Sequence, residues 1–387
     1  MKKKALIVVN LAGFLHFLWN DISTLQEMGY EVSVAMNENS AAGPNLIEIP
    51  KLEEIEIAHY QVDFDTKSPI SRQNVQAYKQ LKLILKRNKY ELIHCHTSIV
   101  GILTRMAARK ERKDGTTVIY TTHGFAFTDR SSKKSWLVYF TAEKLMSRFC
   151  DAIITINHED YNNAKKMHCP NVYVIPSVGL DNKRFADVKT NRDEYRASFG
   201  VKPNDHMVLS VGELSSRKNQ KIIVDALGMI DRKEQYVFVI CGTAVVNSTI
   251  EEELKRKASE LGVRIFLAGH RLDIPEINHC ADVAVIPSIR EGFGMTGVEA
   301  LASGVLVVGS DVQGIREYVI PEKTGYLCDP YSPNQFADAI EKIVNLSPEV
   351  KKQMEASCKK KAEEFDVSKS IAAMKNIYKE VLYHDRK

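Results

Sequence analysis

Short runs of apolar and β-branched residues alternate with longer amphipathic stretches along the chain. Continuous apolar runs, rather than strict alternation, are typical of strands that are covered on both faces. In the first half, strands are predicted at Ala5–Val9, Glu31–Ala35, Glu56–Gln61, Leu92–Cys95, Thr117–Thr121, Ala152–Ile156 and Val172–Ile175. Helices are predicted at Leu15–Met28, Arg72–Lys86, Val100–Arg112, Lys133–Phe149 and Glu159–Lys166. This order predicts a parallel, doubly wound α/β sheet.

The pattern restarts after a stretch rich in Pro, Gly and polar residues at 175–189, which we interpret as a linker. Strands are predicted at Met207–Val211, Tyr236–Ile240, Arg264–Leu267, Val283–Ile286, Val305–Val308 and Gly325–Leu327. Helices are predicted at Asn219–Ile230, Thr249–Leu261, Asp273–His279, Gly294–Ala302, Pro333–Val344, Pro348–Glu364 and Ser368–Tyr383. We therefore expect two Rossmann-like domains, residues 1–180 and 181–367, with the helix in 368–387 packing back on the first. Because such sheets bind ligands at the carboxyl ends of their strands, both domains should face a cleft between them.

Cysteine usage and hydropathy favour a cytoplasmic protein. The seven cysteines are odd in number and form no C-x-x-C pair, which favours reduced thiols over a disulfide framework. The apolar run at the N-terminus ends at Val9 and is too short for a secretory signal. No run of about 18 apolar residues predicts a spanning helix.

The formal charge of +4 is concentrated in the first 180 residues. This basic half suits an anionic partner, such as an acidic lipid surface or a phosphorylated acceptor, and equally suits a solvated helical face. The basic residues are not interleaved with aromatic ones, so no nucleic-acid module is predicted. A membrane-facing surface could be formed by Phe14, Phe17, Leu18 and Trp19 with Lys2–Lys4, and it could be joined by Arg105, Arg109, Arg112 and Lys113. Core packing of the first helix explains the same aromatic residues and is the preferred interpretation.

Residues 292–297 match G-x-G-x-x-G literally, as in a dinucleotide-binding turn. Four residues separate the preceding strand from Gly292, however, and the match lies deep in the second domain. Carboxylates at Glu291 and Glu299 flank it. We therefore interpret it as a phosphate site at a helix start, where the dipole contributes only about 0.3–1 kcal/mol. Arg217 and Lys218 could supply the missing cations, or could simply begin a surface helix.

Four side chains invite a chemical interpretation. Glu299, within the helix, could accept hydrogen bonds from a ribose diol, and Glu291 could meet the hydroxyls of a sugar. His94 and His96 lie on one face of a predicted strand and suggest a metal, but no third ligand is near in sequence. Histidines satisfied by hydrogen bonds are the preferred interpretation.

The string E-G-F-G-x-x-x-x-E-A at Glu291–Ala300 resembles the signature of the family 4 glycosyltransferases, retaining enzymes of the GT-B fold. The resemblance covers nearly the whole chain. Supporting matches are Val211-Gly212 with Lys218, Pro287-Ser288, Leu267–Gly269, Ala281–Val283, Thr324–Leu327, Ile93–Thr97 and Thr122–Phe125.

The resemblance implies roles for these residues. Glu291 and His123 are the expected catalytic groups at the donor sugar, Glu299 binds the nucleotide ribose, and Lys218 binds the diphosphate. Gly13 allows the diphosphate to approach, and the base lies near Gly269 and Arg271. The remaining donor-binding candidates are Gly212, Arg217, Gly292, Phe293, Gly294, Met295 and Thr296.

The chain departs from the family pattern at two positions. Glu213 stands where many members have an arginine after the glycine, and Arg217 is our candidate to compensate for it. Gly13 is followed by Phe14 and not by a second glycine.

The sequence Thr122–Phe127 with Arg130–Lys134 resembles the branch that builds capsular and exopolysaccharide units on polyprenyl diphosphate. This implies transfer of a hexose or N-acetylhexosamine from a nucleotide sugar, with UDP favoured, to a glycan or lipid-linked acceptor. Peripheral contact with the cytoplasmic membrane would follow. No D-x-D-like metal site is evident, so we expect metal-independent catalysis without a cofactor. The alternatives are a nucleotide-sugar epimerase of the same fold and a non-catalytic nucleotide-sugar-binding protein.

Overall fold

The computed structural model describes residues 3–39, 45–66, 68–186, 188–244 and 248–383. Contacts between residues divide the chain into two compact units. The first comprises Met1–Val178 with Ser368–Lys387, and the second comprises Gly179–Val367. Each unit contains a parallel sheet with helices on both faces, which confirms the predicted α/β fold class. None of the described helices is long and apolar enough to cross a membrane.

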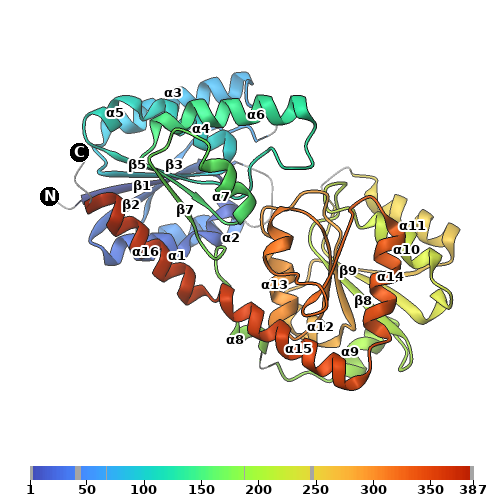
Figure 1. Ribbon diagram of the computed structural model, residues 1–387. Coiled ribbons are helices and arrows are strands. Elements are labelled where there is room, and N and C mark those ends of the chain that lie inside the picture. The colour runs from blue at the N-terminus through green and yellow to red at the C-terminus, as the bar shows by residue number, and fades with distance from the viewer. Residues whose placement is uncertain (1–2, 40–44, 67, 187, 245–247, 384–387) are drawn as a thin grey trace. The chain divides into compact units, whose positions relative to one another are not determined.

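The first unit contains a seven-stranded sheet in the order β3-β2-β1-β4-β5-β6-β7, with every neighbouring pair parallel. Helices α3, α4 and α6 cover one face of this sheet and α1 and α16 the other (Figure 1). Its strands are β1 (Lys3–Leu11), β2 (Tyr30–Asn37), β3 (Ala58–Gln61), β4 (Leu92–His96), β5 (Thr117–Thr121), β6 (Ala152–Thr155) and β7 (Asn171–Val174). Its helices are η1 (Ala12–Phe17), α1 (Trp19–Glu27), α2 (Asn45–Glu54), α3 (Arg72–Arg87), α4 (Ser98–Ala107), α5 (Arg109–Lys113), α6 (Lys133–Met146), η2 (Ser147–Phe149), α7 (His158–Ala164) and α16 (Val367–Tyr383).

The second unit contains a six-stranded parallel sheet in the order β10-β9-β8-β11-β12-β13. Helices α10, α11 and α14 lie on one face and α12 and α13 on the other (Figure 1). Its strands are β8 (His206–Val211), β9 (Tyr236–Cys241), β10 (Arg264–Gly269), β11 (Val283–Ile286), β12 (Val307–Ser310) and β13 (Gly325–Cys328). Its helices are α8 (Lys183–Ala186), α9 (Arg192–Ser198), α10 (Lys221–Met229), η3 (Lys233–Gln235), α11 (Ile250–Leu261), α12 (Ile274–Cys280), α13 (Met295–Ala302), η4 (Gln313–Glu317), α14 (Pro333–Val344), α15 (Pro348–Ala362) and η5 (Glu363–Phe365).

The hydrophobic pattern located every strand, because each central strand is an uninterrupted buried run. Helix ends were predicted less well. The single helix expected at Leu15–Met28 is divided into the 3-10 segment η1 and α1, which join at Leu18. Helix α2 was not predicted, since Pro50 lies inside it and proline is disfavoured within helices.

Helix α16 joins the first unit through polar contacts with segments far away in sequence. The Tyr378 hydroxyl lies 2.8 Å from Nδ1 of His94 on β4, and both residues are fully buried. Ser370 donates a hydrogen bond to the carbonyl of Pro176 at 3.0 Å. The end of the chain therefore completes the core beneath β4.

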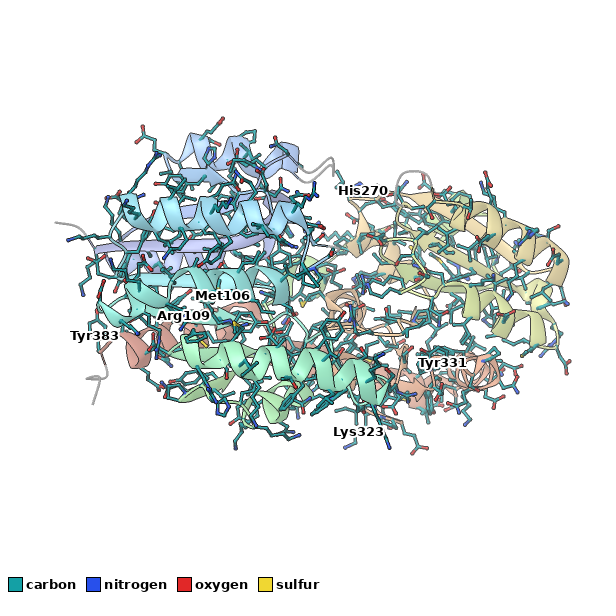
Figure 2. All side chains as sticks on the ribbon, turned by 90° about the horizontal axis from the view of Figure 1, so that it is seen from above. Met106, Arg109, His270, Lys323, Tyr331 and Tyr383 are labelled. Carbon is teal, nitrogen blue, oxygen red and sulfur yellow. The ribbon has the colours of Figure 1, made fainter. Side chains whose placement is uncertain are left out.

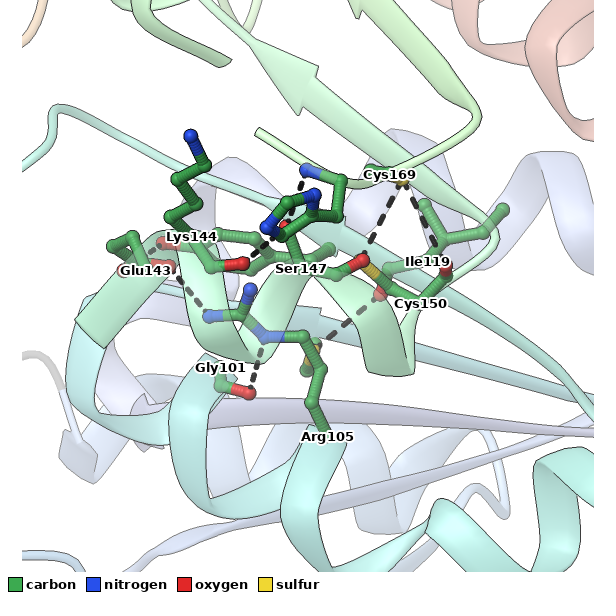
Figure 3. Close-up of polar contacts among 11 residues, drawn as sticks. Gly101, Arg105, Ile119, Glu143, Lys144, Ser147, Cys150 and Cys169 are labelled. Carbon is green, nitrogen blue, oxygen red and sulfur yellow. Dashed lines mark hydrogen bonds and ion pairs between the residues drawn. The ribbon is translucent and has the colours of Figure 1, made fainter. Parts of the chain in front are cut away.

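The surface role considered for Arg105 was wrong. This side chain is fully buried in the first unit, where its guanidinium is 2.6 Å from the Glu143 carboxylate (Figure 3). Helical periodicity places Arg105 beside the buried Gly101 and Thr104, and the buried carboxylate across from it offsets the cost of burying the charge. Lys2, also named for that surface, lies outside the described residues.

We predict that Tyr378→Phe lowers the free energy of unfolding by about 1–2 kcal/mol, because it leaves the buried His94 Nδ1 without its partner. Urea denaturation measures the change. Tyr383→Phe, at an exposed position of the same helix, is the matched control and should be neutral. Equal stabilities for the two variants would contradict a role for the hydroxyl in holding α16.

Candidate functional site

In the second unit, two loops meet at the carboxyl edge of the sheet. Strands β8 and β11 are parallel neighbours, so the loops that follow them lie side by side. The backbone amide of Ile289 donates to the carbonyl of Arg217 at 2.9 Å, and the Asn219 side chain donates to the carbonyl of Pro287 at 3.2 Å. The structure therefore brings together the Arg217-Lys218 pair and the glutamate loop, which are about seventy residues apart in sequence.

The carboxylate of Glu291 is the centre of this loop pair. Its Oε2 accepts from Lys218 Nζ at 2.6 Å and from the Ser288 hydroxyl at 3.0 Å. Arg217 Nη1 lies 3.4 Å from the same oxygen and also donates to the carbonyl of Arg290. Two cationic side chains and one carboxylate thus converge, with one positive charge in excess.

The charges around Glu291 fix its ionisation state. Burial by itself raises its pKa, but the charges of Lys218 and Arg217 and the hydrogen bonds from Lys218 and Ser288 outweigh that effect and lower it. Glu291 is therefore a carboxylate at neutral pH. It can accept hydrogen bonds, but it does not act as a proton donor.

Gly294 connects this carboxylate to the start of α13. Its φ of 83° lies in the left-handed region, and a Cβ here would come within 2.9 Å of both Glu291 Cγ and the Tyr318 hydroxyl. Only glycine fits at this position. Gly294 is the N-cap of α13, and the positive end of the helix dipole attracts an anionic group to this position, close to Glu291.

Glu299 lies in the second turn of α13 and differs from Glu291 in its surroundings. Its carboxylate has no hydrogen bond or ion pair among the described residues, and burial raises its pKa to about 7, opposed only weakly by Arg184. Without a partner among the described residues, this carboxyl group can accept a hydrogen bond from a hydroxyl of a ligand.

The Tyr318 hydroxyl was missed by sequence reasoning. It is fully buried and has no hydrogen-bond partner within the described part of the chain. A Cβ at Gly297 would lie 2.3 Å from it, so the glycines of the G-x-G-x-x-G match make room for this ring. Tyr318 ends a short 3-10 segment, η4, with no sequence pattern that could have revealed it.

The other predicted donor-binding residues occupy several environments. Gly212 ends β8 with a φ of 143°, and the Lys218 side chain passes over it, 3.6 Å from the position of a Cβ. Arg271, after β10 and Gly269, is paired with Asp273. The Phe293 ring is buried against Tyr318 and Phe365, so only its backbone can meet a ligand.

Three of the predicted donor-binding residues lie at the start of α13 or just before it. Met295 and Thr296 open α13 and are half-buried, and Gly292 precedes them in the same loop. Glu213, which replaces the expected arginine, has an exposed side chain, and its carbonyl accepts from Gln220. Arg217, by contrast, reaches Glu291, so it lies where a second cation can contribute.

In the first unit, His123 follows β5 and contacts two other predicted residues. Its Nε2 lies 3.2 Å from Nδ1 of His96, and the edge of Phe14, next to Gly13, packs on its ring at 4.7 Å. Burial lowers the pKa of His123 to about 4, and burial followed by the charge of His94 lowers that of His96. Both imidazoles are therefore neutral at neutral pH.

His94, His96 and Asp21 form a group with atoms close enough to consider a metal, within 4.8 Å of one another. Asp21 comes from α1 and is the third ligand that the sequence did not reveal. The sequence could have revealed it only through the neighbours of Asp21 in the helical pattern, the apolar residues Leu18, Ile22 and Leu25, which are all buried. However, both His94 nitrogens already have hydroxyl partners, Tyr378 at 2.8 Å and Thr121 at 2.7 Å.

The outcome for these two histidines is divided. His94 is satisfied, as expected, whereas His96 Nε2 is buried and has no hydrogen-bond partner within the described part of the chain. A cavity of about 20 Å³, lined by Asp21, His123, Thr121 and Ser177 among others, adjoins the group. That volume suits one water molecule. The group therefore fits a polar network better than a metal centre.

A larger cavity, of about 510 Å³, lies in the second unit, away from Glu291. Asp282, Val305 and Leu306 line it, and these residues precede β11 and β12. It is thus at the amino ends of the strands, opposite the edge that carries Glu291. The chemistry, and not the size of the cavity, identifies the candidate site.

The raised pKa of Glu299 predicts a pH dependence of stability. Between its ordinary value of 4.5 and about 7 the folded protein binds more protons than the unfolded one, so stability falls as pH rises through this window. Glu299→Gln should remove this loss and raise the free energy of unfolding at pH 8 by about 1–3 kcal/mol. Thermal unfolding from pH 4.5 to 8 measures it, with the exposed Glu260→Gln as control. Parallel pH profiles for wild type and Glu299→Gln would disprove the raised pKa of Glu299.

Comparison with known protein families agrees with both halves of the chain. Residues 18–178 match the glycosyltransferase family 4 model, and residues 191–365 match the model of glycosyl transferases group 1. EpsD of Bacillus subtilis, which carries a provisional glycosyltransferase assignment, is 31% identical over 96% of this chain and 93% of its own length. A UDP-Gal:α-D-GlcNAc-diphosphoundecaprenol α-1,3-galactosyltransferase of Escherichia coli is 29% identical over 80% of this chain and 82% of its own.

Solved structures show the same fold at lower identity. HepE of Anabaena, in complex with UDP-glucose, aligns with a TM-score of 0.76 and 20% identity over 96% of this chain and 98% of its own. Sucrose-phosphate synthase of Thermosynechococcus elongatus aligns with a TM-score of 0.77 and 19% identity over 98% and 99%. With the fold, the glutamate loop and a relative above 30% identity in agreement, the chain belongs to the family 4 glycosyltransferases, enzymes of the GT-B fold.

Proposed function

We propose that this glycosyltransferase moves a hexose or N-acetylhexosamine from a UDP-sugar to a polyprenyl-diphosphate-linked acceptor, with retention of the anomeric configuration. The observation that carries the proposal is the convergence of Lys218 and Arg217 on Glu291, whose side chain lies next to Gly294 at the start of α13. UDP and the lipid-linked acceptor are supported by the galactosyltransferase relative, whose name specifies both.

The second unit supplies what departure of a diphosphate requires. Negative charge develops on the leaving group as the anomeric bond breaks, and fixed cations and amides stabilise it without reorganising. Lys218 and Arg217 offer this charge, and we propose that Arg217 replaces the arginine missing at Glu213. Glu291 holds Lys218 in place at 2.6 Å, so the cation is positioned by the protein itself.

The two glutamates divide the recognition of the donor. Glu291, held ionised, accepts hydrogen bonds from hydroxyls of the transferred sugar, and Glu299 accepts them from the nucleotide ribose. Neutral His123 offers one ring nitrogen to the donor sugar while the other is held by His96. The acceptor proton passes to the departing phosphate oxygen, consistent with a retaining enzyme that has no separate base. Because Lys218 and Arg217 supply the positive charge, no metal is needed in this scheme.

The test of the function is a donor panel followed by a transfer assay. UDP-, GDP- and ADP-sugars are compared by thermal shift, and the stabilising donor is incubated with a polyprenyl-diphosphate-linked sugar in the presence of EDTA. Product with the anomeric configuration of the donor is expected. An epimerised donor formed without acceptor would identify an epimerase, and donor binding without product from any acceptor would identify a binding protein.

Lys218→Met should weaken UDP binding by about ten- to a hundredfold, because a charge-assisted contact to the diphosphate is lost. Lys221→Met, three residues further on at an exposed position, is the matched control and should bind UDP normally. Glu291→Gln and His123→Ala should instead lower kcat with little change in UDP affinity. Calorimetry and steady-state kinetics separate the two effects, and unchanged UDP affinity in Lys218→Met would refute its role.

A lipid-linked acceptor requires contact with a membrane, and α6 offers a suitable surface. Leu137, Val138 and Tyr139 are exposed on this helix, next to the exposed Lys133 and Lys134. Helices α4 and α5, beside it, add Met106 and Arg109 (Figure 2). Apolar side chains flanked by lysines suit the interface of an anionic bilayer. Of the aromatic residues first considered for such a surface, only Phe17 is exposed.

Replacing Leu137 and Val138 together by glutamate should reduce binding to vesicles containing an anionic phospholipid at least fivefold, by removing apolar contact and adding repulsion. Sedimentation with the vesicles measures the bound fraction. Met229→Glu, which adds charge at an equally exposed apolar position of the second unit, is the control. Equal sedimentation of wild type and the α6 variant would exclude this face.

A further inference from the structure

A buried polar cluster in the first unit has no part in the proposed transfer. Its centre is Arg105 on α4, fully buried, with Nε donating to the carbonyl of Gly101 at 2.9 Å and Nη2 to Glu143 at 2.6 Å (Figure 3). The remaining nitrogen, Nη1, is buried and has no hydrogen-bond acceptor among the described residues. A buried guanidinium with an unused donor can stabilise a further anionic group near it.

The group available is a cysteine pair beside Arg105. The sulfur of Cys150 lies 3.7 Å from that of Cys169, and Figure 3 shows both at the edge of the cluster. All seven cysteines of the chain are reduced and lie within the described residues, and this is the one sulfur–sulfur contact found there. Since a disulfide needs sulfurs about 2.05 Å apart, a small movement would join them.

Cys169 is the partner that can move toward the other sulfur. Cys150 is fully buried between η2 and β6, whereas Cys169 is partly exposed in the loop before β7. Cys169 donates weakly to the carbonyl of Asn171 at 3.3 Å, and its neighbours His168 and Pro170 are exposed. A small oxidant can therefore reach Cys169 from solvent, and the loop can carry it toward Cys150.

The electrostatics favour one thiolate in the pair. Burial raises the pKa of the Cys150 thiol, but its hydrogen bond with Cys169 and the charge of Arg105 outweigh this and lower it. That same hydrogen bond, followed by burial, raises the pKa of Cys169. The 3.7 Å contact lets a proton pass between the two sulfurs, and the charge of Arg105 stabilises the thiolate that remains when the pair loses one proton.

We propose that Cys150 and Cys169 form a redox-active pair that closes to a disulfide when the protein meets a hydroperoxide. With the remaining proton on Cys150, the Cys169 thiolate attacks the peroxide and becomes a sulfenic acid, releasing hydroxide. That hydroxide takes the proton from Cys150 and becomes water. The Cys150 thiolate then attacks the Cys169 sulfur and expels a second hydroxide. The two sulfurs are oxidised, the peroxide oxygens are reduced to water and hydroxide, and charge is conserved.

The pair lies away from the candidate site. Cys150 precedes β6 and Cys169 precedes β7, so both are at the amino ends of these strands, whereas His123 follows the carboxyl end of β5. Glu291 and Lys218 are in the other unit. The inference is therefore independent of the proposed transfer reaction and can fail without affecting it.

The experiment counts thiols in the intact chain. Protein is exposed to a few equivalents of hydrogen peroxide, unfolded, and alkylated with N-ethylmaleimide before mass spectrometry. Reduced protein should carry seven adducts and oxidised protein five, with peptide mapping placing the link between Cys150 and Cys169 and dithiothreitol restoring all seven. Arg105→Lys should slow the closure severalfold, because a lysine cannot make the same set of contacts.

The controls are conservative serine variants at one partly exposed and one buried cysteine. Cys169→Ser, at a partly exposed site, should carry six adducts before and after peroxide, whereas Cys241→Ser, a buried cysteine of the second unit, should still lose two. The proposal is overturned if wild type retains seven adducts, if a different pair is joined, or if Cys169 is oxidised beyond sulfenic acid without a link to Cys150.

Discussion

The parallel pairing of β8 with β11 is the constraint on which the candidate site depends. These strands are far apart in sequence, yet their carboxyl ends meet at one edge, and the loop after each contributes half of a charged cluster. Lys218 comes from one loop, and Ser288 and Glu291 come from the other. A different strand order would leave the lysine and the glutamate as ordinary surface charges. The backbone bond from Ile289 to Arg217 holds the two loops together independently of those charges.

The two units use polar groups in opposite ways. In the second unit, the site is charged: an ionised Glu291 lies between two cations, and the protein keeps the positive charge in excess for an anionic ligand. In the first unit, the polar residues near His123 are buried and neutral, with the pKa values of His94, His96 and His123 all lowered by burial. A neutral imidazole can donate and accept at once, which suits a group that contacts sugar hydroxyls. In the proposed reaction, the first arrangement suits a charged leaving group and the second suits an uncharged sugar.

Buried charge also has a structural use in this protein. Arg105 is enclosed completely, with Glu143 as its counter-ion and the Tyr120 ring 4.0 Å from its guanidinium carbon. Such a pair costs desolvation energy and is retained where geometry repays it. Here the arginine joins α4 to α6 and leaves one donor without an acceptor among the described residues, close to a cysteine pair. The same residue thus links helix packing to thiol chemistry in a part of the fold that no catalytic motif marks.

The sequence by itself determined the strands, the α/β class and most of the candidate site. Buried parallel strands must be continuous apolar runs, and a glycine-started helix flanked by two glutamates is a rare local string, so both can be recognised without coordinates. Glu291 and Glu299 were predicted from this string, Lys218 from its place after a strand, and His123 from the family resemblance, and their roles stay predictions. The tertiary structure alone decided which distant groups became neighbours. Three contacts join segments whose separation no periodicity encodes: Asp21 with His94 and His96, Tyr378 with His94, and Cys150 with Cys169. The buried hydroxyl of Tyr318, which has no partner among the described residues, could not be predicted either. It also placed Arg105 in the interior, because Glu143, thirty-eight residues away, offsets the cost of burying its charge.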